Sequence, residues 1–151
     1  MKTLNILILT LFTTLSIIAQ SDHYNIQKGY VAKGFDVVSY FDNKAEKGDK
    51  KYTVEYEDVK FKFTSKENLD KFNSDPESYI PQYGGYCAYA IGKNSDKVKI
   101  NPETYEIRDG KLYLFYHTIF ANTLDKWLEE GPENLKTQAD QNWMTIKKDD
   151  Q

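Results

Sequence analysis

Two stretches of alternating apolar and polar side chains constrain the fold of this chain more than any other feature. Across residues 52–63, valine and aromatic residues alternate with polar ones on both sides of a Glu-Asp pair at 57–58, and this period of two is that of a β-strand. Across residues 104–116, two apolar-rich runs flank an Asp-Gly pair at 109–110, which favours a two-residue hairpin turn. The chain is therefore predicted to contain two antiparallel β-hairpins.

Three amphipathic segments are predicted as helices. The first begins after Thr64 or Ser65, either of which can cap it, and ends before Pro76. The other two are residues 119–130 and 132–146, which are separated by a Gly-Pro pair that ends one helix and starts the next. Two hairpins and about three helices make a small, single-domain α+β fold.

Residues 1–19 have the pattern of a secretory signal peptide. A short basic start is followed by an apolar run at 4–18 and by the small residue Ala19. The run is shorter than the roughly 20 residues that a membrane-spanning helix needs. We expect cleavage after Ala19, export to the periplasm or secretion, and no stable membrane anchor. A flexible lead-in is expected at 20–29 and the folded domain at 30–148.

The charge balance excludes one broad class of function. The chain has 20 Lys and Arg against 23 Asp and Glu, a net charge of -3, which is not the basic balance of a general nucleic-acid binder. The lysines are scattered along the sequence and predict no phosphate-reading patch. The sequence also lacks a phosphate-binding glycine loop, a nucleophile elbow, a paired-histidine zinc motif and a dinucleotide fingerprint. No nucleic-acid partner is expected.

Cys87 is the only cysteine, so the chain forms no internal disulfide and no cysteine-rich metal site. Cys87 can pair with a thiol of another chain, and for an unpaired Cys87 two interpretations stay open. It is either a small buried residue of the core, or an accessible thiol that binds a soft metal or a redox-active ligand. In the second case its pocket would be lined by the neighbouring glycines and tyrosines, which otherwise close the core: Tyr83, Gly84, Gly85, Tyr86 and Tyr89.

His117 is the second candidate, because it follows the second predicted hairpin. It is either a structural histidine at a helix start or a partner of Cys87, with which it would ligate a metal or act as a base. Two ligands are too few for a complete site, so His23 or Met144 would have to contribute. Copper is the first metal to test, because thiolate, imidazole and thioether donors suit Cu(I).

Several short motifs follow one another in a specific order and spacing along the chain. They are Gly34-Phe35-Asp36-Val37-Val38-Ser39-Tyr40-Phe41, Phe61-Lys62-Phe63-Thr64-Ser65, Phe72 with Asp75-Pro76-Glu77-Ser78-Tyr79, Gln82-Tyr83-Gly84-Gly85-Tyr86-Cys87-Ala88-Tyr89 and Asp109-Gly110-Lys111-Leu112-Tyr113-Leu114. In this order and spacing the motifs resemble a YHS domain, and residues 30–147 resemble the exported single-domain YHS proteins of bacteria. YHS domains accompany heavy-metal-transporting ATPases and some oxygenases, so the resemblance implies a small α+β fold and metal binding by cysteines near the first hairpin.

This chain departs from the metal-associated pattern of that family. Where the pattern has three cysteines, this chain has Ser39, Thr64 and Asn68. The tyrosine and histidine positions of the family name hold Phe61 and Lys62. Neutral hydroxyls and an amide do not replace thiolates as ligands of a soft ion, so the family's metal site is not carried over.

The sequence predicts an exported protein that binds a small ligand or a soft metal ion near Cys87, and it favours a non-enzymatic protein over an enzyme. One alternative is a thiol-dependent redox protein or small enzyme in which Cys87 attacks and His117 assists. Another is an interaction module whose exposed aromatic surface docks a second exported protein.

Overall fold

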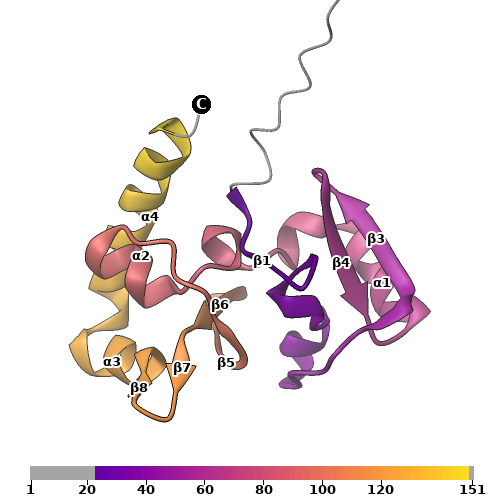
Figure 1. The fold of residues 1–151 in the computed structure, drawn as a ribbon, viewed down its shortest axis with the longest axis horizontal. Coiled ribbons are helices and arrows are strands. Elements are labelled where there is room, and N and C mark those ends of the chain that lie inside the picture. Colours follow the sequence, from indigo (N-terminus) through magenta and orange to yellow (C-terminus); the bar gives the residue numbers. More distant parts are fainter. Residues whose placement is uncertain (1–22, 150–151) are drawn as a thin grey trace, which may run out of the picture.

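The protein is described by a computed structural model that covers residues 23–149. The predicted signal peptide and the first residues of the predicted lead-in lie outside the described residues. The described chain is a small α+β domain, as the sequence predicts (Figure 1). No helix in this described part is long and apolar enough to cross a membrane.

Both predicted hairpins are confirmed. They are formed by β3 (Asp49–Tyr56) with β4 (Val59–Phe63), and by β5 (Asn101–Arg108) with β6 (Lys111–Phe115), and both are antiparallel. Their two-residue turns are the Glu-Asp and Asp-Gly pairs of the sequence. All four turn residues have positive φ, which matches the right-handed twist of the flanking strands.

Two further short strand pairs are present, and each corrects an expectation. They are β1 (Ile26–Gln27) with β2 (Tyr30–Val31), and β7 (His117–Thr118) with β8 (Ala121–Asn122). The described part of the predicted lead-in is therefore folded, and residues 119–122 form a hairpin tip and strand instead of the start of a helix. Neither pair is long enough to show a period in the sequence.

Four α-helices are described, where about three were predicted. They are α1 (Lys66–Ser74), α2 (Ala88–Asn94), α3 (Thr123–Glu130) and α4 (Pro132–Asp149). Helix α1 begins at the predicted cap, where Ser65 accepts a hydrogen bond from the Asn68 backbone N–H. Helix α3 begins four residues later than predicted, capped by Asn122.

Helix α2 lies in the glycine- and tyrosine-rich stretch around Cys87, for which no helix was predicted. It has seven residues and includes Gly92, so the sequence pattern there is weak. Gly92 allows a close approach to α4, because a Cβ at this position would lie 2.7 Å from the carbonyl oxygen of Leu135. The packing of α2 on α4 therefore stabilises a helix that its own sequence does not favour.

Two aromatic clusters form the core on the two sides of the domain. Near β3, β4 and α1, the ring of Phe72 lies 4.8 Å from that of Phe61 and 5.1 Å from that of Phe63. Near β5, β6 and α3, the fully buried Trp127 contacts the rings of Tyr113 and Phe115. Figure 1 shows these two sides with β1 between them.

Candidate functional site

Cys87 is fully buried at the start of α2. Its Sγ lies 3.2 Å from Thr123 Oγ1. Because the Thr123 hydroxyl donates to the carbonyl oxygen of Tyr116, the Cys87 S–H is the donor in this contact. This environment is that of a small packing residue, the first of the two interpretations.

His117 lies in β7 and is exposed. Its Nδ1 is 3.0 Å from Thr104 Oγ1, and no hydrogen bond joins it to Cys87. Within residues 23–149 there is no group of three or more His, Cys, Asp or Glu side chains that could hold a metal ion. The structure thus gives Cys87 and His117 separate partners and does not bring them to one cavity.

The predicted pocket-lining residues divide into two groups. Tyr83 and Gly84 line a cleft of about 550 Å³. Gly85, Tyr86 and Tyr89 do not line it and take part in packing and hydrogen bonding instead. Among residues 23–149, the lining consists of His23, Tyr24, Glu57, Glu77, Ile80, Pro81, Gln82, Tyr83, Gly84, Asp140, Trp143, Met144 and Lys147.

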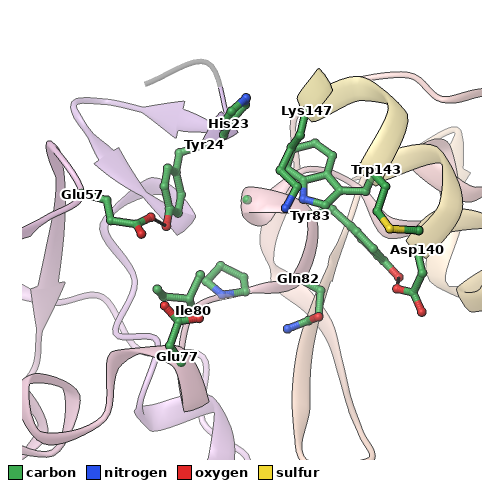
Figure 2. A pocket seen from close by; sticks show the side chains of 13 residues that line it. His23, Tyr24, Glu57, Glu77, Ile80, Gln82, Tyr83, Asp140, Trp143 and Lys147 are labelled. Carbon is green, nitrogen blue, oxygen red and sulfur yellow. Dashed lines mark hydrogen bonds between the residues drawn. The ribbon is translucent and has the colours of Figure 1, made fainter. Parts of the chain in front are cut away.

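The cleft lies between the two sides of the domain. Figure 2 shows Tyr24 and Glu57 on one side of it, with Asp140, Trp143 and Lys147 of α4 on the other. The segment 80–84 joins the two walls. Most residues of this site were not predicted from the sequence, because they are far apart in the chain. In addition, the sequence pattern around its aromatic residues is also that of residues that pack in a hydrophobic core.

Two tyrosine–carboxylate pairs fix the walls of the cleft. Tyr24 donates to Glu57 at 2.6 Å, and Tyr83 donates to Asp140 at 2.9 Å. Burial, and then the hydrogen bond to the carboxylate, raises the pKa of both tyrosines well above the ordinary value. Both hydroxyls therefore stay protonated and keep donating across the neutral and moderately alkaline range.

Gly84 allows the segment with His23 and Tyr24 to pack closely against it, because it has no side chain. Gly84 has φ +61, and a Cβ on it would lie 1.7 Å from the carbonyl oxygen of His23. The backbone N–H of Asn25 donates to Gly84 O at 2.9 Å, and the Asn25 side chain donates to Gly85 O at 2.9 Å. The segment with residues 23–25 therefore packs against the paired glycines Gly84 and Gly85. This packing positions Tyr24 in the wall of the cleft.

The cleft combines aromatic rings with negative charge. In the part of the chain that the structure describes, its lining has three carboxylates, Glu57, Glu77 and Asp140, against one lysine, Lys147. Trp143 adds the largest aromatic surface, since its ring packs against those of His23, Tyr83 and Tyr86. Carboxylates beside aromatic faces are the arrangement that attracts a cationic group.

The three positions at which the family pattern has cysteines gather around one buried carboxylate. Asp36 is fully buried, and its Oδ2 accepts hydrogen bonds from Thr64 N, Thr64 Oγ1 and Asn68 Nδ2 at 2.7 to 2.8 Å. Its Oδ1 accepts from the backbone N–H groups of Val38 and Ser39. Five protein donors surround this carboxylate, so the cluster joins the loop to the end of β4 and has the character of a structural network.

Tyr89 takes part in a surface link between α2 and the end of α3. Its hydroxyl donates to Glu130 at 2.7 Å, and Lys93 donates to the second Glu130 oxygen at 2.6 Å. The hydrogen bond from Lys93, and then that from Tyr89, lowers the pKa of Glu130, while the same pairing raises the pKa of Lys93. Ionised Glu130 therefore stabilises the folded protein at pH values above the ordinary pKa of glutamate. This stabilisation is lost as the pH falls through the lowered pKa of Glu130 in the folded protein.

We expect the substitution Lys93→Met to raise the pKa of Glu130 toward its ordinary value, because it removes the largest cause of the lowering. The measurement is a carboxyl ¹³C NMR titration of Glu130. Lys126→Met is the matched control, since Lys126 acts on Glu130 only through space and is the smallest cause given, and it should shift the pKa less. An unchanged Glu130 pKa in Lys93→Met would contradict the pairing.

No family model, curated protein or solved structure matches the chain. Its function is therefore inferred from the residues and geometry described above.

Proposed function

We propose that this chain is an exported, YHS-type binding protein that takes a small organic cation in the cleft between Tyr24 and Trp143. Export is proposed from the signal-peptide pattern of residues 1–19, and the family from the ordered motifs of residues 30–147. The observation that carries the ligand proposal is the cleft itself, with its aromatic walls and excess of carboxylates.

The size of the cleft supports a small molecule as ligand. Its volume of about 550 Å³ lies within the range of roughly 300 to 1,000 Å³ that is common for small-molecule sites. Its walls come from segments that the docking at Gly84 and the Tyr83–Asp140 hydrogen bond hold together. A site fixed in this way needs little rearrangement on binding, which favours affinity.

The chemistry of the lining supports a cation. An ammonium group placed against Trp143 or Tyr24 gains roughly 0.5 to 2 kcal/mol from the ring, more when the group loses its water. Glu57 and Glu77 each use one oxygen to accept a tyrosine hydroxyl, from Tyr24 and Tyr56 respectively. Their remaining oxygens can accept from or attract the cation.

The cleft is better supported as the ligand site than the surroundings of Cys87. The sulfur is fully buried and hydrogen-bonded to Thr123, and Cys87 lines neither the cleft nor the cavity of about 450 Å³ near His117. The same burial weakens the support for copper binding and for a thiol-dependent reaction at Cys87, because each needs an accessible thiolate. We therefore propose binding without catalysis.

The test is isothermal titration of residues 20–151 with choline and with 3,3-dimethylbutan-1-ol, its neutral isostere. Because the two probes differ in charge and not in shape, choline is expected to bind about tenfold more tightly or better. Equal affinity for the two probes, or binding of neither, would contradict the proposed cation site.

Variants locate the binding in the cleft. Trp143→Ala should weaken choline binding by about tenfold or more, and Lys147→Gln should strengthen it because a like charge is removed. Phe120→Ala is the matched aromatic control, since Phe120 is 91% exposed and is not part of the cleft lining. Equal binding by the wild type and Trp143→Ala would place the choline site elsewhere.

A further inference from the structure

A second cavity, of about 450 Å³, gathers lysines that are scattered in the sequence. We propose that this cavity, called here the lysine pocket, binds a phosphate-type oxyanion. The described residues that line it are Lys28, Lys33, Phe35, Lys47, Ile100, Asn101, Pro102, Glu103 and His117. None of these residues lines the cleft, so the proposal does not depend on the proposed cation site.

Backbone pairing brings Lys33 and Lys47 to the same wall. Phe35 and Lys47 form an antiparallel β-bridge. On either side of it, Gly48 N donates to Gly34 O at 2.9 Å and Asp36 N donates to Glu46 O at 2.8 Å. Two segments that are separated in sequence by a loop thus bring Lys33 and Lys47 to one cavity.

The other two candidate hydrogen-bond donors, Lys28 and His117, come from two further segments. Lys28 lies in the turn between β1 and β2, where the neighbouring Gln27 side chain donates to the carbonyl oxygen of Ile100 at 3.4 Å. His117 reaches the same cavity from β7, with its Nδ1 held at Thr104. The pocket therefore has potential donors on several sides.

The charges of the lysine pocket are not balanced within the described part of the protein. Lys66, Lys71, Lys93 and Lys136 each have a carboxylate partner within 4 Å, whereas no such partner is found for the pocket lysines among residues 23–149. Glu103 is the one carboxylate in the described lining. The positive charges of three lysines that line one cavity repel one another, and an oxyanion bound there would relieve this repulsion. The proposal therefore differs from the sequence-based expectation that the scattered lysines form no phosphate-reading patch.

The backbone guides the choice of variants. Lys28 and Lys33 both have left-handed conformations, with φ of 54° and 57°. Asparagine tolerates this conformation better than most residues, so Lys28→Asn and Lys33→Asn remove charge without adding backbone strain. Lys47→Gln completes a triple variant of the pocket. The matched control removes the same charge from exposed lysines outside it, as Lys60→Gln, Lys111→Gln and Lys126→Gln.

Phosphate could reach the pocket free in solution or as part of a lipid headgroup, and an apolar tip beside the pocket allows the two sources to be distinguished. Ile119 and Phe120, at the turn between β7 and β8, are each 91% exposed and lie just after His117. Such side chains would enter a lipid interface, but they would not affect the binding of free phosphate.

The experiment has two arms, inorganic phosphate followed by titration calorimetry and vesicles of phosphatidylglycerol or phosphatidylcholine followed by co-sedimentation. The proposal predicts binding in at least one arm, weakened about tenfold or more in the pocket triple variant and little changed in the control triple variant. If the source is a lipid, the double variant Ile119→Ser and Phe120→Ser also loses binding to phosphatidylglycerol vesicles while keeping any binding to phosphate. Binding in neither arm, or equal losses in the two triple variants, would overturn the proposal.

Discussion

Replacing Asp36 by asparagine is expected to lower the free energy of unfolding by about 4 kcal/mol. The Asp36 carboxylate is fully buried and accepts five hydrogen bonds, two at Oδ1 and three at Oδ2. Hydrogen bonds to a charged group contribute about 1.5 to 3 kcal/mol each, and the donors left without an acceptor add a desolvation cost.

Asparagine is the informative substitution because it keeps the shape of aspartate. Either orientation of its amide turns an NH₂ group toward backbone N–H donors: toward Val38 and Ser39 in one orientation, or toward Thr64 in the other. No rotation can restore the network, since an amide has one accepting oxygen and a carboxylate has two.

Urea denaturation measures the effect. Asp70→Asn is the matched control, because Asp70 is exposed and pairs only at the surface with Lys66, and we expect a change of about 0.5 kcal/mol or less. A loss of less than about 1 kcal/mol in Asp36→Asn would mean that the carboxylate does not join the loop to β4 as described.

Gly84→Ala is expected to cost about 3 kcal/mol and to abolish choline binding in the cleft. The new Cβ would lie 1.7 Å from the carbonyl oxygen of His23, a backbone atom that cannot move without the segment that carries Tyr24. Displacing that segment breaks the hydrogen bond from Asn25 to Gly84 and moves one wall of the cleft.

Gly110→Ala is the control that separates the steric clash at Gly84 from the cost of placing alanine in a left-handed backbone conformation. Gly110 has φ +70, close to the +61 of Gly84, but a Cβ on it would have no neighbour within 4 Å. It should therefore cost only about 1 kcal/mol, the usual penalty of a left-handed alanine, and should leave choline binding intact. Thermal or urea denaturation of the two variants is the measurement, and equal costs would show that no close contact exists at Gly84.

Local patterns were enough to predict the elements that form within short stretches. The two hairpins follow from period-two alternation and their turn residues, while α1 and α4 follow from a cap and a Gly-Pro boundary. Helix α2 was missed because it is short and depends on contact with α4 through Gly92. Residues 119–122 were misassigned because the apolar Ile119 and Phe120 read as a helix face, whereas they form an exposed tip.

The sites were less predictable because their residues meet only in the folded chain. Tyr83 and Gly84 were identified from an unusual local sequence, but Tyr24 lies in a polar segment without any period, and Trp143 looks like an ordinary core residue of an amphipathic helix. The same holds for the lysine pocket, whose lysines converge through a β-bridge and a turn. Cys87 drew attention because it is unique in the sequence, yet uniqueness says nothing about exposure.

The most direct test of the proposed cation site is a ¹H–¹⁵N NMR titration of residues 20–151 with choline, followed at the indole N–H of Trp143. We predict saturable shifts at this group and at the backbone amides of Tyr24 and Gly84, with little change at Cys87 and His117. Absence of a shift at Trp143, or saturable shifts centred on Cys87, would contradict a ligand site in the cleft.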